Sequence, residues 1–231
     1  NAAGRMIPEE IDGRRLRPFA GAHADRGGGR KAAPPVRAVA DYGNKLRASL
    51  DEAIEACNLA DGATVSFHHH LRNGDGLVNM VVDRLAARGL RNLTLAPSAL
   101  FPVHEPLVGH VESGVISHIE GSMNGPVGEA CSLGKMSRCC ILRSHGGRYR
   151  AIQDGDIHVD AAFIAAPQAD EHGNVNGLDG PSACGVVSYG LADSLYAENV
   201  VVVTDNLVPF PNYPWPIMGG NVDHVLSLIH I

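Results

Sequence analysis

The sequence predicts an α/β domain with a largely parallel sheet flanked by helices, on three observations. Short apolar runs typical of buried strands alternate with segments of helical periodicity from about residue 42 onward. The connections between them are short. Glycine and polar residues cluster after the strand-like runs, at the edge where such sheets bind ligands.

Each element follows from its local pattern. The first helix is expected to place Leu46, Leu50, Ile54 and Cys57 on one face, and the second to close near Gly89. Strands are expected at 63–67, 92–97, 115–121, 139–144, 159–167 and 198–205. Helices are expected at 45–59, 77–90, 106–114, 126–134 and 186–196.

Composition restricts the class of protein. The 231 residues are 45% hydrophobic and 19% charged, as in a globular protein with a substantial core. A net charge of −6 argues against nucleic acid as the main partner. Five cysteines without a CxxC motif predict reduced thiols and a cytoplasmic protein. No apolar stretch approaches the roughly 20 residues of a membrane span.

The chain is expected to divide into an arm and a domain. Residues 1–40 contain "RGGGRKAAPP" and predict an extended N-terminal arm with little regular structure. A flexible leader is favoured there over a strap across a partner subunit. Residues 41–225 then form the domain.

Three consecutive histidines, His68, His69 and His70, follow the strand at 63–67. A zinc site is disfavoured, because adjacent strand residues point to opposite faces and no HxH or HExxH motif accompanies them. They either pack at the strand end, or donate to an anionic substrate together with Arg72. The next helix begins near Leu77, and its N-terminus favours negative charge. Asp75 is then a helix cap or a site residue, with the cap favoured.

Two further loops carry candidate residues. "SHGGRYR" (144–150) is either a plain glycine turn or an oxyanion hole built from the Gly146 and Gly147 N–H groups, with Arg148 forked onto a carboxylate. "PQADEHGNVNG" (167–177) is either a tight turn with Asn caps or a site loop. Its Glu171 is a candidate nucleophile or base, or a solvated acid.

Several long motifs together resemble the alpha chain of citrate lyase, a citrate CoA-transferase. They are "DGATVSFHHHLRNGD", "NLTLAPSALFPVHEPLVGHVESGVI", "SHGGR", "GDIHVDAAFIAAPQADEHGNVNG" and "SACG", and the resemblance runs from about Gly4 to Val225. It implies a CoA-transferase-like (NagB/RpiA-like) fold. It also implies exchange of acetate for citrate on the CoA-like prosthetic group of an acyl carrier protein, within a hetero-oligomer that includes a lyase (beta) subunit.

The resemblance, with the loop chemistry, gives a set of expected site residues. Relatives are thought to react through an anhydride, so Glu171 is not required as a nucleophile and its role stays open. No bound metal or covalently bound cofactor is expected. The expected catalytic residues are His145, Gly146, Gly147 and Glu171, and the expected substrate-binding residues are His68, His69, Arg72, Asn73, Arg148, Asn174 and Asn176.

Two departures from the family pattern lead to further expectations. The family's second domain is expected to be absent from this chain, and this chain alone is therefore expected to be inactive. Residues 226–231, "LSLIHI", are expected to be a non-native tail. The alternative functions are another carboxylate acyl-CoA transferase or hydrolase, and an inactive assembly module of the lyase complex.

Overall fold

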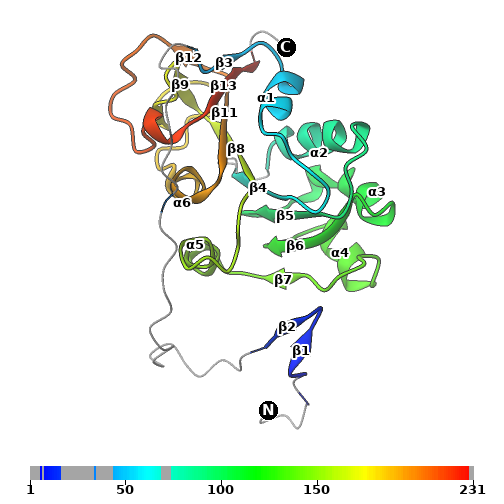
Figure 1. The fold of residues 1–231 in the computed structure, drawn as a ribbon. Coiled ribbons are helices and arrows are strands. Elements are labelled where there is room, and N and C mark those ends of the chain that lie inside the picture. The colour runs from blue at the N-terminus through cyan, green and yellow to red at the C-terminus, as the bar shows by residue number, and fades with distance from the viewer. Residues whose placement is uncertain (1–5, 7, 17–33, 35–43, 69–73, 229–231) are drawn as a thin grey trace, which may run out of the picture.

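The centre of the protein is a fully parallel eight-stranded sheet, which confirms the predicted fold class. The computed structural model describes residues 6, 8–16, 34, 44–68 and 74–228 (Figure 1). In spatial order the strands are β3 (Leu46–Arg47), β13 (His224–Ser227), β11 (Asn199–Thr204), β8 (Ala161–Ala166), β4 (Thr64–His68), β5 (Leu93–Pro97), β6 (Ile116–Gly121) and β7 (Ile141–Leu142).

Helices cover both faces of the sheet (Figure 1). One face carries α1 (Leu50–Ala56), α2 (Leu77–Ala87), α3 (Leu107–Glu112) and α4 (Pro126–Ser132); the other carries α5 (His145–Gln153) and α6 (Ser188–Tyr196). The strands alternate between two cores, as the period of two requires. In β4, Val65 and Phe67 pack on the α1–α4 side. Ser66 and His68 therefore face α5 and α6.

The first helix is shorter than predicted. Leu46 lies in edge strand β3, and the helix begins only after Ser49, whose hydroxyl accepts from the Glu52 N–H. The Glu52 carboxylate in turn accepts from the Ala48 N–H at 2.8 Å. This reciprocal cap fixes the start of α1, so the apolar period that runs through Leu46 did not mark the helix boundary.

Smaller sheets flank the main one. β9 (Gln168–Asp170), β10 (Val175–Asn176) and β12 (Leu207–Val208) form a three-stranded sheet beyond the carboxyl ends of β8 and β11. Short 3-10 helices are η1 (Pro102–His104) and η2 (Gly219–Asn221). Inside the predicted arm, β1 (Glu10–Ile11) and β2 (Arg14–Arg15) form an antiparallel hairpin, so the described part of the arm does contain regular structure.

The carboxyl end of the domain extends past the predicted boundary. β13 includes Leu226 and Ser227, and both are buried. Their pairing with Arg47 and with β11 makes them part of the sheet, so excluding them from the domain was wrong. Residues 229–231 lie outside the described residues.

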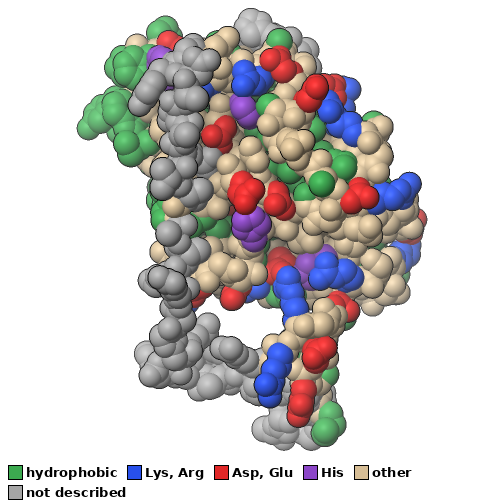
Figure 2. Space-filling view, in the orientation of Figure 1, with side chains coloured by type: hydrophobic (Ala, Val, Ile, Leu, Met, Phe, Trp, Pro, Cys, Tyr) green, Lys and Arg blue, Asp and Glu red, His purple; other side chains and the backbone are tan. Residues whose placement is uncertain are grey.

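All five cysteines are free thiols. On the face shown in Figure 2, basic and acidic side chains are interspersed and form no continuous basic area. None of the helices in the described part of the chain has the length and apolar character needed to cross a membrane.

Candidate functional site at the carboxyl edge of the sheet

The carboxyl ends of β8 and β11 and the start of α2 line a cavity of about 160 Å³. Ala166 and Pro167 continue from β8, Asp205 from β11, and Gly76 and Leu77 open α2. The start of an 11-residue helix therefore lies beside the cavity, where a helix N-terminus favours negative charge, and its Leu77 N–H already donates to the Asp75 carboxylate. The predicted residues His69, Arg72 and Asn73 belong to the segment just before α2 and lie outside the described residues.

The conformation of the backbone at Gly74 and Asp75, just before α2, is fixed by contacts with His104. Gly74 has φ +81°, and a Cβ there would lie 2.6 Å from His104 Cε1, so no side chain fits. The His104 ring contacts the Asp75 carbonyl oxygen at 3.0 Å and accepts from the Phe101 N–H at 2.9 Å. Asp75 accepts from the Leu77 N–H at 2.9 Å, but the N-cap residue of α2 is Gly76, so Asp75 lies one residue before the cap position and not at it as predicted.

Two predicted histidines come together on the other face of β4. His68 lies edge-on to Tyr189 with ring centroids 5.5 Å apart, and His145 stacks on the same tyrosine at 4.9 Å. Gly190 allows this approach, because a Cβ there would lie 3.2 Å from the His68 ring. Tyr189 was not predicted as a site residue, although it lies in a predicted helix.

Arg148 does not reach toward a substrate, contrary to the prediction. Its side chain is 3% exposed and forms an ion pair with Asp193 of α6 at 2.9 Å. It also donates to Ser66 and, at 2.8 Å, to the Ala96 carbonyl. Burial raises the pKa of Asp193, and Arg148 and Ser66 oppose that shift. One Arg148 nitrogen contacts both oxygens of the Asp193 carboxylate, at 2.9 and 3.2 Å, so the carboxylate partner of Arg148 belongs to this chain and not to a substrate.

The glycine pair is helical. α5 begins at His145, and the Gly147 N–H donates to the capping hydroxyl of Ser144 at 3.1 Å. This N–H is therefore occupied, which corrects the expectation that it faces a substrate carbonyl. Gly146 instead lines an open groove of about 550 Å³ between α5 and α6, next to Tyr189.

Asn174 and Asn176 are occupied within a buried polar network, which corrects their assignment to substrate. The Asp170 carboxylate accepts from the Asn174 side chain at 2.8 Å and from the Asn212 N–H at 3.0 Å. The Asn176 amide donates to Asn212 at 2.6 Å. Half-buried Glu171 accepts from the Phe210 N–H at 3.1 Å. It takes no part in the contacts of His68 and His145 with Tyr189.

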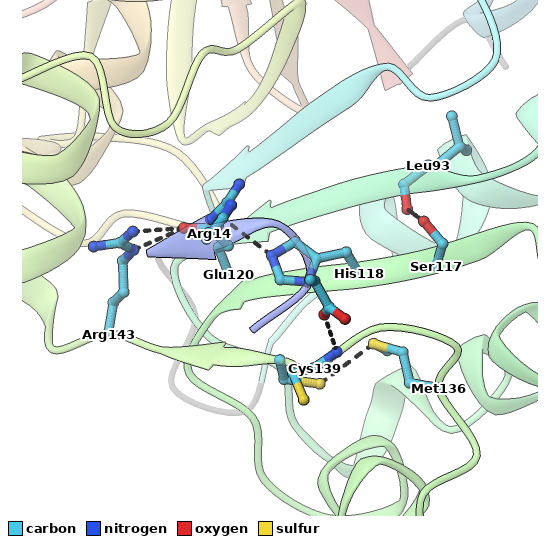
Figure 3. Close-up of polar contacts among 10 residues, drawn as sticks. Arg14, Leu93, Ser117, His118, Glu120, Met136, Cys139 and Arg143 are labelled. Carbon is cyan, nitrogen blue, oxygen red and sulfur yellow. Dashed lines mark hydrogen bonds and ion pairs between the residues drawn. The ribbon is translucent and has the colours of Figure 1, made fainter. Parts of the chain in front are cut away.

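A buried carboxylate near the carboxyl end of β6 was missed. Figure 3 shows Arg14 and Arg143 directed at Glu120, and Arg143 donates to it at 2.7 and 2.9 Å. Burial disfavours the charged form, but hydrogen bonds from His118, Arg14 and Arg143 outweigh it and lower the pKa of Glu120 to about 2. Because Arg14 belongs to the N-terminal hairpin, Glu120 joins that hairpin to the domain.

One group of three potential metal ligands occurs among the described residues: His158, Asp160 and Glu198. It lies at the amino ends of β8 and β11, opposite the cavity, and is an ion-pair cluster in which His158 contacts Glu198 at 3.0 Å. Asp160 also accepts from the Thr64 N–H at 2.7 Å.

Comparison with known proteins shows which family this chain resembles. The family model for the citrate lyase alpha subunit (CitF) matches residues 43–231. The citrate lyase alpha chains of Escherichia coli and Klebsiella pneumoniae are 43% and 44% identical over 185 residues, which cover 80% of this chain. The chain spans only 36% of the length of these relatives.

Solved structures lead to the same family. A Streptococcus mutans protein described as the alpha subunit of citrate lyase, in complex with citrate, superposes with a TM-score of 0.84. Its identity is 44%, covering 89% of this chain and 40% of that one. Glutaconate CoA-transferase from Acidaminococcus fermentans shares the fold alone, with a TM-score of 0.58 and 14% identity over 80% of this chain and 75% of that one. The chain therefore belongs to the citrate lyase alpha subunit family.

Proposed function

We propose that this chain forms the first part of a citrate CoA-transferase, which exchanges acetate for citrate on a thioester of an acyl carrier protein. The family match over residues 43–231 carries this proposal. The Streptococcus mutans relative with bound citrate supports citrate as the acid. The partners, by the same reasoning, are an acyl carrier subunit with a CoA-like prosthetic group and a lyase subunit.

The carboxyl edge of the sheet is the proposed site of the reaction. A citrate carboxylate that attacks a thioester needs cationic and N–H donors around several negative charges. The start of α2 supplies N–H groups beside the cavity, and Arg72 of the preceding segment is the proposed cationic partner. On the opposite face, His145 remains the proposed catalytic histidine and His68 a binding residue.

Several expected roles change or remain open within this proposal. Arg148, Asn174, Asn176 and Gly147 act as structural residues that hold the strand ends in place. Glu171, Gly146, His69 and Asn73 keep their proposed roles at the site. The remaining part of the site is proposed to come from the portion of the alpha subunit that this chain does not span.

A chimera tests the proposal. The matched 185-residue region of the Escherichia coli alpha chain is replaced by this chain, and citryl thioester formation from the acetyl carrier protein and citrate is followed by mass spectrometry. Activity supports the proposal. A folded chimera that transfers acetyl groups only to other acids would contradict citrate as substrate, and one that transfers none would contradict the activity.

Arg72→Ala in the chimera is expected to raise KM for citrate about 10- to 100-fold, because a hydrogen bond to a charged group contributes roughly 1.5–3 kcal/mol. Arg91→Ala is the matched control, because Arg91 precedes β5 at the opposite edge and donates to the Ser113 carbonyl. Equal effects of the two substitutions would exclude Arg72 from the site.

A further inference from the structure

A buried serine at the carboxyl edge of the sheet has an unpaired hydroxyl group. Ser98 directly follows β5, and only 7% of its surface is exposed. Its hydroxyl oxygen forms no hydrogen bond with any group in the described part of the chain. A buried polar group without a partner lowers stability, so folded proteins retain few of them. The position of Ser98 therefore requires an explanation.

The register of the sheet places Ser98 beside His68. β4 and β5 are parallel, and their last registered pair is Phe67 and Pro97. The Ser98 N–H continues this ladder, because it donates to the Phe67 carbonyl at 3.0 Å. The next residues along the two strands, His68 and Ser98, are therefore neighbours, since adjacent strands lie about 4.8 Å apart.

Ser98 also shares a face of the sheet with the two proposed site histidines. Side chains alternate along a strand, so Ser98 lies on the same side as Ala96, which packs in the core beneath α5 and α6. His68 faces the same helices. α5 begins at His145, and its N-terminus favours negative charge. A Cβ on Gly146 would meet nothing within 4 Å, so the first turn of α5 leaves open space.

Buried serines at other levels of the sheet are paired. Ser66, two residues before the end of β4, donates to the Asp193 carboxylate at 2.8 Å. Ser117, at the amino end of β6, donates to the Asn92 carbonyl at 2.9 Å. The fold thus provides acceptors for buried hydroxyl groups below the carboxyl edge. At the edge itself, Ser98 is left for an acceptor that the described part of the chain does not supply.

We propose that Ser98 is a further substrate-binding residue, whose hydroxyl group donates to a carboxylate of the bound acid beside His68 and His145. This inference rests on the proposed function and adds a residue to its site. An ionised carboxylate only accepts hydrogen bonds, so it is the partner that an unpaired hydroxyl donor requires. The backbone ladder holds Ser98 in place before the acid binds, which limits the entropy lost on binding.

The first test compares stability in this chain. Ser98→Ala removes a hydroxyl group that has no partner, so the urea midpoint of unfolding is expected to stay the same or to rise. Ser117→Ala is the matched control, because it removes the same atom from a buried serine whose hydrogen bond is made, and its midpoint is expected to fall. A midpoint of Ser98→Ala that falls as far as that of Ser117→Ala would show a structural hydroxyl group and overturn the proposal.

The second test uses the chimera. Ser98→Ala is expected to raise KM for citrate about 10- to 100-fold, as for a lost hydrogen bond to a charged group, with KM for the acetyl carrier protein unchanged. Ser117→Ala is expected to leave both values unchanged. Tricarballylate, which keeps the three carboxylates of citrate but lacks its hydroxyl group, is expected to lose affinity as an inhibitor by the same factor. A loss confined to citrate would overturn the contact with a carboxylate.

Calorimetric titration of the same chimeras with citrate separates this inference from the proposed function. A parent chimera that binds citrate but transfers no acyl group contradicts the function, and the affinity of Ser98→Ala still tests the contact. A drop of about 10- to 100-fold in that affinity supports the role of Ser98. Equal affinity of the parent and Ser98→Ala overturns it even in an active chimera, and a parent that binds no citrate overturns both.

Discussion

The buried ion pair between Arg148 and Asp193 gives the sharpest prediction. Both side chains are almost fully buried and lie 2.9 Å apart, between α5 and α6. Removing one partner leaves the other as an uncompensated buried charge, which costs roughly 3–5 kcal/mol. Arg148→Met and Asp193→Leu are each expected to lower the free energy of unfolding by that amount.

The double substitution is expected to lower the free energy of unfolding by much less than the sum of the two single losses. It removes both charges, and the Ala96 carbonyl keeps a donor because Ser66 Oγ lies 3.2 Å from it. The residual loss is then about 1–2 kcal/mol, typical of one weakened buried hydrogen bond. Urea unfolding of the four proteins, followed by far-UV circular dichroism in reductant, gives the coupling energy. Single losses below about 1 kcal/mol, or strictly additive losses, would refute this reasoning.

The two single variants are also expected to differ in pH dependence. Burial already raises the pKa of Asp193, and Arg148→Met raises it further, so the isolated carboxyl group takes up a proton as pH falls. A folded-state pKa above the unfolded value adds stability at low pH that is lost as pH rises through the folded pKa. The Arg148→Met defect should therefore shrink between pH 8 and pH 5. The Asp193→Leu defect should not, because arginine stays charged.

Three other predictions concern separate parts of the fold. The pKa of Glu120 falls to about 2, below its unfolded value, so ionised Glu120 stabilises the fold above about pH 4.5 and this stabilisation is lost toward pH 2. The loss in the natural chain is at most about 3 kcal/mol, and it is smaller because solvent screens Arg14. Acid unfolding of Glu120→Gln should lack this pH-dependent loss. Arg14→Ala should speed hydrogen exchange in residues 10–15, whereas Arg15→Ala on the exposed strand should not; equal rates would contradict docking through Glu120. Asn174→Ala should lower stability by about 1–3 kcal/mol, because a hydrogen bond to the buried Asp170 carboxylate is lost, with KM for citrate in the chimera unchanged.

Regular structure with a strong period was predictable, and the local exceptions have identifiable causes. β4, β5 and β11 are apolar runs that leave little choice of structure. α5 was missed because two glycines disfavour a helix by roughly 1 kcal/mol each. The Ser144 cap and the burial of Ala151 and Ile152 on the sheet overcome that cost.

The candidate site was predictable in position but not in partners. The edge of the sheet follows from strand direction alone, and His68 and His145 each contact Tyr189. The partner of Arg148 is 45 residues away in sequence, in a helix whose rotation the pattern does not fix. The same holds for Asn174, since its neighbour Asn212 comes from a loop 38 residues later. Polar contacts between residues far apart in the sequence therefore decided which candidate side chains remained available to bind a substrate.

The pairing of β3 with β13 also determines when the fold can be completed during synthesis. The strand at residues 46–47 has its only sheet neighbour, among the described residues, at residues 224–227. Lys45 strengthens this closure by donating to the Gly219 and Val222 carbonyls at 2.6 and 2.7 Å. Until the ribosome has released residue 227, β11 presents an unpaired edge, which is a template for pairing between nascent chains. The nascent chain is thus expected to depend on chaperones until residue 227 has left the ribosome, and a chain that stops before residue 224 is expected to aggregate.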